Sequence, residues 1–362
     1  MVAERDERLE LRDGTRLISR IWAPDSQGPW PALLMRQPYG RSIASTVTLA
    51  HPSWWASNGY LVVVQDVRGQ GDSEGDFQGF GQEAQDTAET LEWVRSLPDC
   101  NGRLGCYGFS YQGVTQLLAP AGTPPPDCMA PAMAGLDERL HWSCEGGAHW
   151  WHLGLGWGLQ LAAQRARRDG HHEAWQEIRR SLVNGDYLLN GLELLRRHDP
   201  EGMAHRWFEN DPHQPQQWQR HSVETSWLQQ PLLLIGGWWD PHLNGILDLW
   251  QRSRAAGGRP ELHIGPATHL QWWPEAQQRL LDFFDRHLKG YGAAEHPEPM
   301  LWDLGNRSWV QPTAEDCGRW SLTGSELNVL NPSDGQLQRG DSGCGRVSIV
   351  HDPWRPAPAQ GG

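Results

Sequence analysis

The sequence predicts an α/β protein built on a mostly parallel sheet. Short apolar runs recur along the chain, and each is bounded by Gly or Pro, as is typical of strands buried on both faces. Helical spacing appears between several of them, notably at 83–97 and 245–254. Alternation of this kind indicates a parallel sheet with helices between its strands. The expected strands are residues 9–11, 16–23, 32–35, 60–64, 104–107, 129–134, 232–235 and 261–264.

The strand pattern is interrupted once. Residues 136–226 contain no strand-like run and are rich in Trp, His, Arg and Gln, with helical spacing in three stretches. Because the sheet pattern resumes at Pro231, we interpret this segment as a helical cap inserted between two strands, with an independent domain as the alternative. The remaining parts are expected to be a sheet domain formed by residues 1–135 and 227–293, and a separate β region over 294–362.

Composition excludes several classes of partner. The 362 residues carry a net charge of −13, so no basic surface is expected for nucleic acid. No apolar run approaches the roughly 18 residues of a membrane helix, and the charged start lacks a secretory signal. Six scattered cysteines indicate reduced thiols rather than a disulfide framework. We therefore expect a cytoplasmic protein that acts on a small molecule without a membrane partner, and a homo-oligomer is left open.

Ser110 is the strongest candidate nucleophile. It stands in Gly-Cys-Tyr-Gly-Phe-Ser-Tyr-Gln-Gly, between an apolar strand-like stretch and a helix-compatible one. A strand, a sharp turn and a helix in this order hold a serine hydroxyl exposed above a parallel sheet. Gly108 and Gly113 leave room where the strand and helix backbones come close. The run predicts a serine hydrolase.

A catalytic serine needs a histidine base, which in turn is oriented by a carboxylate. In hydrolases with this elbow the chain order is Ser, acid, His, with the partners at strand ends. Asp240 follows the expected strand at 232–235, and His269 follows the one at 261–264. Ser110, Asp240 and His269 are therefore the predicted triad. Four rivals lie inside helical or strand patterns: Asp248, Asp282, His263 and His287.

An oxyanion hole requires hydrogen-bond donors that are in place before the reaction begins. One is expected to be the backbone N–H of Tyr111, directly after the nucleophile. Met-Arg-Gln-Pro-Tyr-Gly-Arg occupies the usual place of the second donor loop, and Tyr39 is its only neutral side-chain donor with suitable reach. The alternative is a tyrosine packed at a turn. Acyl transfer through these groups requires neither a metal nor a cofactor.

Five segments stand in order along nearly the whole chain. They are Arg-Gln-Pro-Tyr (36–39), Gln-Asp-Val-Arg-Gly-Gln-Gly-Asp-Ser-Glu-Gly (65–75), Gly-Phe-Ser-Tyr-Gln-Gly (108–113), Gly-Trp-Trp-Asp (237–240) and Gly-Pro-Ala-Thr-His (265–269). Together they resemble the cocaine esterase/X-prolyl dipeptidyl peptidase family of α/β-hydrolases, the CocE/NonD hydrolases. The glycine three positions after the serine fits this family better than lipases in general.

The resemblance implies an α/β-hydrolase fold with the triad and oxyanion donors named above. It also implies a helical cap at about 136–226 and a C-terminal jelly roll. The chain departs from the family in two places. Residues 351–362 resemble a segment near the start of the jelly roll, so we expect an incomplete, truncated domain, and Ala267 stands where a tryptophan is common.

Other polar and aromatic residues are expected to have structural or substrate-binding roles. His141, Cys144, His149 and His152 match no closed zinc pattern, so no metal site is predicted. An ion-paired network that holds a loop is expected for Asp66, Arg68, Asp72 and Glu74, with binding of a charged substrate group as the alternative. Three cap tryptophans are predicted to contact the substrate, with packing of the cap on the sheet as the alternative: Trp150, Trp151 and Trp157.

The expected reaction is hydrolysis of an ester or amide bond of a small acyl substrate through a covalent acyl-enzyme. Family members cleave esters, β-lactam precursors, acyl amides or N-terminal X-Pro dipeptides. The Xaa-Pro dipeptidyl-peptidase alternative requires an acidic group to hold a free α-ammonium, and Glu145 is the candidate. A third hypothesis is a catalytically impaired fragment that binds its ligand without turning it over.

Overall fold

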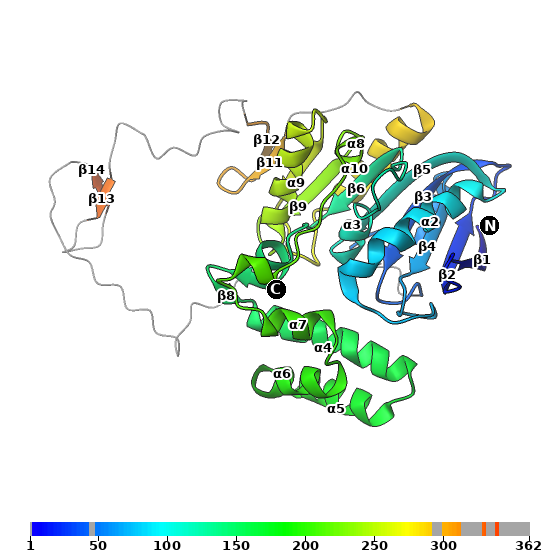
Figure 1. Cartoon of the computed structure of the whole chain (residues 1–362). Helices are drawn as coiled ribbons and strands as arrows, with labels where there is room; N and C mark the ends of the chain where they lie inside the picture. The colour runs from blue at the N-terminus through cyan, green and yellow to red at the C-terminus, as the bar shows by residue number, and fades with distance from the viewer. Residues whose placement is uncertain (1, 43–47, 292–298, 313–327, 331–336, 340–362) are drawn as a thin grey trace. The chain divides into compact units, whose positions relative to one another are not determined.

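A ten-stranded sheet forms the centre of the computed structural model (Figure 1). The structure describes residues 2–42, 48–291, 299–312, 328–330 and 337–339. The strands lie in the order β1-β2-β4-β3-β5-β6-β9-β10-β11-β12. Their bounds are β1 Ala3–Glu10, β2 Arg16–Ala23, β3 Trp30–Gln37, β4 Leu61–Asp66, β5 Cys100–Phe109, β6 Cys128–Ala132, β9 Leu233–Gly237, β10 Glu261–Gly265, β11 Met300–Asp303 and β12 Ser308–Val310.

The predicted parallel sheet is confirmed for its central strands. Neighbouring strands from β4 to β11 run parallel, whereas β2 is antiparallel to both β1 and β4. Every residue of β4, β6, β9 and β10 is buried, which explains their nearly continuous apolar sequences. β1 is longer than predicted because it pairs with β2 over its full length, while its charged side chains face solvent at the sheet edge.

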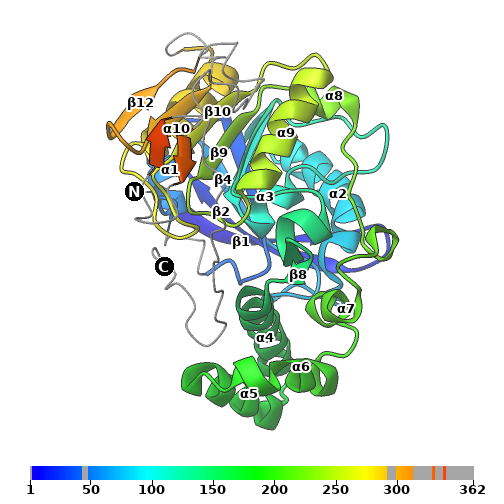
Figure 2. The same cartoon turned by 90° about the vertical axis from the view of Figure 1, so that its left-hand side faces the viewer.

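Helices cover both faces of the sheet. Figure 2 shows α1 and α10 on one face, with α2, α3, α8 and α9 on the other. These helices are α1 Pro52–Ser57, α2 Glu83–Ser96, α3 Tyr111–Thr115, α8 Thr225–Leu228, α9 Leu243–Ala255 and α10 Ala276–Phe284. Between α1, α10 and the sheet, the ring of Trp55 lies 5.3 Å from that of Tyr107 and 5.9 Å from that of Phe284, measured between centroids. All three side chains are fully enclosed, so large aromatic rings make up much of this core.

A helical insertion leaves the sheet after β6 and returns to it at β9. Its helices are α4 Trp151–Arg168, α5 His172–Asn184, α6 Tyr187–His198 and α7 Met203–Glu209. Both views show α4 to α7 gathered at one end of the molecule (Figures 1 and 2). The insertion has its own apolar cluster, which includes Leu155, Leu159, Ile178 and Leu195. It also contains a short hairpin, β7 Cys144–Glu145 with β8 Ala148–His149, which the sequence pattern did not indicate.

The chain divides by its contacts into Met1–Trp309 and Val310–Gly362. This division falls later than the expected boundary between 293 and 294, because β11 pairs with β10 and extends the main sheet. In the second unit β13 (Asn328–Leu330) pairs antiparallel with β14 (Leu337–Arg339). The rest of the predicted incomplete jelly roll lies outside the described residues.

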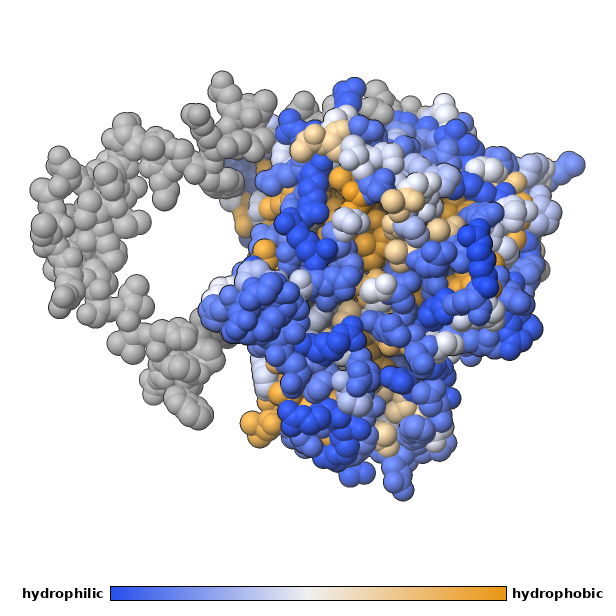
Figure 3. All heavy atoms as spheres, viewed as in Figure 1, coloured by the Kyte–Doolittle hydropathy of each residue, from blue (hydrophilic) through white to orange (hydrophobic). Residues whose placement is uncertain are grey.

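The face of the molecule seen in Figure 3 is mainly hydrophilic, and apolar residues appear on it in smaller groups among the hydrophilic ones. Among the described residues no helix combines the length and the apolar character needed to cross a membrane.

Candidate active site

Ser110 occupies a sharp turn between β5 and α3. Its backbone has φ 59° and ψ −129°, a left-handed conformation that is strained for a residue with a side chain. The flanking glycines make the turn compact: a Cβ on Gly108 would lie 2.4 Å from the Gln112 Cβ, and one on Gly113 would lie 2.7 Å from the Ala134 Cβ. The spacing of glycines around the serine is therefore dictated by the close approach of strand and helix.

The structure brings Asp240 and His269 together from adjacent strand ends. The two atoms His269 Nδ1 and Asp240 Oδ1 are 2.6 Å apart. The Asp240 side chain is fully buried and also accepts a hydrogen bond, 3.1 Å long, from the His242 backbone N–H. Because a carboxylate only accepts, Nδ1 carries the hydrogen, and in the neutral ring Nε2 is left as the base.

Tyr39 follows β3 and its hydroxyl faces the same site. The Trp157 Nε1–H donates to the Tyr39 oxygen across 3.1 Å, and Ser110 is a second hydrogen-bond partner. Burial raises the pKa of Tyr39 to about 12, although both hydrogen bonds act in the opposite direction. The hydroxyl therefore stays protonated at neutral pH and can donate to an oxyanion.

Tyr111 is held at the start of α3, directly after Ser110. As the first helical residue it has a backbone N–H without an intrahelical acceptor. Its hydroxyl donates to the Glu83 Oε1 across 2.7 Å, and Glu83 forms a buried ion pair with Arg36 in which Arg36 NH1 and Glu83 Oε2 are 2.9 Å apart. Burial raises the pKa of Glu83, which the charge of Arg36 opposes. This enclosed network fixes the helix that presents the amide, and the sequence pattern did not reveal it.

All four residues of the predicted ion-paired network form ion pairs, but only Asp66 and Asp72 share a partner, which is Arg41 in the loop that carries Tyr39. Arg41 NH1 lies 2.8 Å from Asp66 Oδ2 and 2.7 Å from Asp72 Oδ2. The Arg41 backbone N–H also donates to Asp66. Arg68 pairs instead with Asp86, its NH2 being 2.7 Å from Oδ1. Since Arg41 is two residues after Tyr39, the network fixes the position of the proposed oxyanion donor.

A cavity of about 420 Å³ joins these groups, because Tyr39, Ser110 and His269 all line it. Of the three predicted substrate-binding tryptophans, Trp157 lines the cavity and the other two do not. The ring of Trp150 lies 5.8 Å from that of His242, measured between centroids. Trp151 is 42% exposed, and its Nε1–H donates to the Leu188 carbonyl. Two lining residues that the sequence did not single out are Trp142 and His242.

His242, with Asp240 and His269, also forms the one metal-type cluster among the described residues. One ligand-type atom from each lies within 4.8 Å of the others. The Nδ1 atoms are already engaged, that of His269 with Asp240 and that of His242 with the backbone oxygen of His141 at 2.6 Å. These contacts are those of an oriented histidine base rather than of an assembled metal site.

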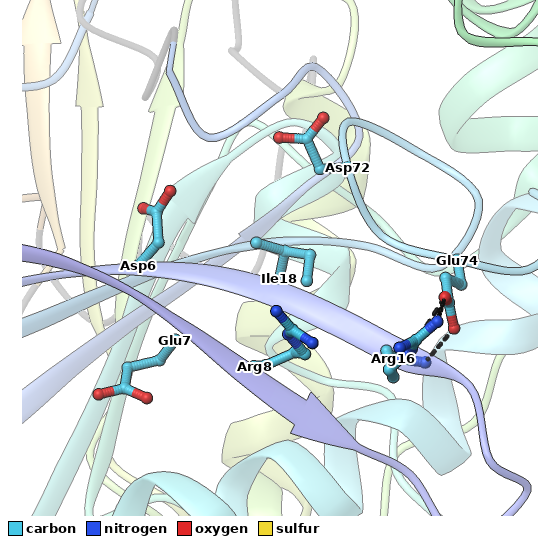
Figure 4. A pocket seen from close by; sticks show the side chains of 7 residues that line it. All are labelled: Asp6, Glu7, Arg8, Arg16, Ile18, Asp72 and Glu74. Carbon is cyan, nitrogen blue, oxygen red and sulfur yellow. Dashed lines mark hydrogen bonds and ion pairs between the residues drawn. The ribbon is translucent and has the colours of Figure 1, made fainter.

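A larger hollow of about 590 Å³ lies beside β1 and β2, and none of the predicted triad residues lines it (Figure 4). It is lined mainly by charged side chains, among which Arg16 pairs with Glu74. Asp6 is also paired, its Oδ2 being 2.9 Å from Arg41 NH2. Because this hollow has no serine, histidine or cysteine in its lining, the smaller cavity at Ser110 is the candidate active site.

Comparison with known proteins identifies the class of fold and of enzyme. Residues 13–271 match the family of X-Pro dipeptidyl-peptidases (S15 family). The chain therefore belongs to this family of serine hydrolases, and its predicted resemblance is confirmed. It is 28% identical to cocaine esterase from Rhodococcus sp. (strain MB1 Bresler) over 394 residues, which cover 98% of this chain and 68% of the relative.

Two solved structures share the fold. A CocE/NonD family hydrolase from Staphylococcus aureus has a TM-score of 0.68 at 19% identity, with 94% of this chain and 60% of that chain covered. An aminopeptidase from a marine sediment archaeon, Thaumarchaeota archaeon, has a TM-score of 0.62 at 19% identity, with 86% and 58% covered. The chain thus spans less than two thirds of the length of these neighbours.

Proposed function

We propose that this chain hydrolyses small esters, and more slowly amides, through a covalent acyl-enzyme. The observation that carries the proposal is the 2.6 Å contact between His269 Nδ1 and Asp240 Oδ1, at a cavity that Ser110 also lines. In the first step His269 Nε2 takes the proton of Ser110 as Oγ attacks the carbonyl carbon. The Tyr39 hydroxyl and the Tyr111 backbone N–H stabilise the oxyanion.

The second half of the cycle uses the same groups. His269 protonates the departing alcohol or amine, and the acyl group remains on Ser110. Water then enters, His269 takes its proton, and attack on the acyl carbon releases the acid and restores the serine. Asp240 stabilises the imidazolium that forms in each half, since its carboxylate is held next to Nδ1.

The lining of the cavity favours ester or amide substrates over dipeptides with a free amino terminus. No Asp or Glu is among the described residues that line it. Glu145, the predicted ammonium partner, is exposed on β7 and is not part of the lining. A free α-ammonium buried in this cavity would lack a carboxylate partner, which is unfavourable. The peptidase hypothesis is therefore the second candidate, supported by the family description alone.

The test is hydrolysis of p-nitrophenyl acetate by the wild-type chain and by Ser110→Ala. We expect the variant to lose at least about 10⁴-fold in kcat/KM, because the nucleophile is absent. A fluorophosphonate probe followed by intact mass should label the wild type and not the variant. Turnover by Ser110→Ala would refute the mechanism, and an unlabelled wild type would favour the binding-protein hypothesis. An Ala-Pro chromogenic peptide assayed in parallel tests the peptidase.

A further inference from the structure

His242 is a cavity-lining residue to which the proposed mechanism gives no role for its ring. It directly precedes α9, two residues after Asp240, and is only 4% exposed. Its ring centroid lies 4.9 Å from that of His269 and 4.4 Å from that of Trp142. The residue therefore stands between the catalytic base and the aromatic wall of the cavity.

The hydrogen bond at Nδ1 defines the tautomer of this ring. Nδ1 of His242 lies 2.6 Å from the backbone oxygen of His141. A carbonyl oxygen only accepts, so Nδ1 carries the hydrogen. Burial lowers the pKa of His242 to about 4, and the ring is consequently neutral near pH 7. Nε2 is then an acceptor with a free lone pair.

Nε2 of His242 is accessible from the cavity. Within the part of the chain that the structure describes, the His242 side chain makes one hydrogen bond, and it makes it through Nδ1. Nε2 has no hydrogen-bond partner among the described residues and is not fully buried. His242 lines the cavity. Because His242 is nearly buried and lines this cavity, we expect this unpartnered acceptor to face the cavity.

Three aromatic rings, those of Trp142, Trp157 and His242, line this side of the cavity, and Nε2 of His242 is their one polar atom without a hydrogen-bond partner in the described part of the chain. Trp142 stacks on Trp157 with centroids 5.8 Å apart. The indole N–H of Trp142 donates to the Gly135 oxygen across 2.7 Å, and that of Trp157 donates to Tyr39. The three rings of Trp142, Trp157 and His242, here called the aromatic wall, thus present flat apolar faces and a single acceptor.

We propose that the aromatic wall is a specificity subsite for a substrate group that carries a hydrogen-bond donor, which binds His242 Nε2. The substrate class is esters with an aryl or alkyl group bearing a hydroxyl or N–H. The inference rests on the proposed hydrolase function and narrows its substrates. A group of the same shape without a donor would desolvate Nε2 and leave it unpaired, so it is disfavoured.

The first arm of the test places the donor on the acyl side. The probes are the p-nitrophenyl esters of 4-hydroxyphenylacetic acid and 4-methoxyphenylacetic acid, which differ in the donor. The second arm places it on the alcohol side, with the acetates of 2-(4-hydroxyphenyl)ethanol and 2-(4-methoxyphenyl)ethanol followed by acid release. We expect wild-type kcat/KM to favour the hydroxyl ester by about fivefold to tenfold in one arm, as one neutral hydrogen bond allows.

Variants at position 242 assign the preference to the ring nitrogen. His242→Phe keeps an aromatic ring and the backbone N–H to Asp240 but has no acceptor, so the ratio of hydroxyl to methoxy ester should fall to about one. His242→Gln retains an acceptor and should keep part of the preference. The matched control is His152→Phe, at a second histidine of the cavity lining that is exposed, and its ratio should equal that of the wild type.

Two outcomes would overturn the subsite. One is a wild type that does not prefer the hydroxyl ester in either arm, which needs no variant to fold. The other is a His242→Phe variant that slows all four esters equally, because a ring that only packs against His269 would act on every substrate alike. Both differ from failure of the proposed function, in which wild-type protein would neither hydrolyse p-nitrophenyl acetate nor react with the fluorophosphonate.

Discussion

The sheet domain and the helical insertion contribute to the site in different ways. Ser110, Asp240 and His269 each follow a strand of one sheet, so the positions of the backbone largely fix their mutual geometry. The insertion packs around a separate apolar cluster and supplies side chains such as Trp157 from the face of a helix. The comparison indicates that the geometry of the proposed reacting groups depends on sheet topology, whereas the wall of the pocket depends on how helices pack.

The comparison predicts the largest loss of activity for a substitution of a triad candidate at a strand end. Asp240→Asn should lower kcat for p-nitrophenyl acetate by about 10⁴-fold, because an amide at this position favours the wrong tautomer of His269. Steady-state rates measure the effect. Asp248→Asn is the control, since that acid pairs with Arg252 on α9, Oδ2 to Nε being 2.7 Å, and lies outside the cavity lining. Equal losses in both variants would contradict the assignment of the acid.

A smaller loss of activity is expected when the proposed oxyanion donor of the sheet domain, Tyr39, is replaced. Tyr39→Phe should lower kcat by about 10²- to 10³-fold with little change in KM, because the hydroxyl is proposed to bind charge that exists only in the transition state. Initial rates measured over a range of substrate concentrations separate kcat from KM. A variant that raises KM alone would show instead that Tyr39 binds the ground state.

His242 lies where the two regions meet, since its ring binds the His141 carbonyl of the insertion and lies beside Asp240 and His269 of the sheet domain. Its folded pKa of about 4 lies below the ordinary value of 6.5, so the unfolded chain binds the proton more readily between these values. The stability it supports is present above pH 6.5 and is lost as the pH falls toward 4. Between pH 7 and pH 5, wild type should lose about 2 kcal/mol more unfolding free energy than His242→Phe.

Urea unfolding of both proteins at the two pH values tests this difference. Identical pH dependence in wild type and variant would mean that His242 titrates alike in the folded and unfolded chains.

The smallest effect on kcat is expected for the hydrogen bond that the insertion donates to the sheet domain. Trp157→Phe removes the N–H that donates to the Tyr39 hydroxyl, and kcat should fall by about fivefold. In the Tyr39→Phe background the same change should have no further effect on kcat, because the acceptor is gone. Trp151→Phe is the matched control, since its indole N–H donates to the Leu188 carbonyl outside the cavity. If the losses in kcat of the two single variants add in the double variant, Trp157 acts independently of Tyr39.

The same comparison explains what the sequence could predict. Buried parallel strands have continuous apolar runs, so β4, β9 and β10 were located within one or two residues, and strand-end order then identified Ser110, Asp240 and His269 as candidates. These roles remain predictions. The position of β11 in the main sheet could not be predicted, because strand pairing is not encoded in one short run.

Side-chain direction in the insertion was less predictable. α4 begins at Trp151, and it contains glycines that lower helix propensity. A Cβ on Gly158 would lie 2.4 Å from that of Ala204 on α7, so the glycine serves packing between helices. Which tryptophan of α4 faces the cavity follows from this packing, and a pattern of spacing alone does not contain it.

The left-handed backbone at Ser110 has a consequence for the evolution and engineering of this chain. A glycine there would adopt φ 59° without strain, so a sequence that folds more stably at this turn lacks the proposed nucleophile. Selection for stability alone would therefore remove the reacting oxygen, and selection for activity must hold it in place. Libraries screened only for thermal tolerance should accumulate glycine at position 110, whereas a paired activity screen should retain serine.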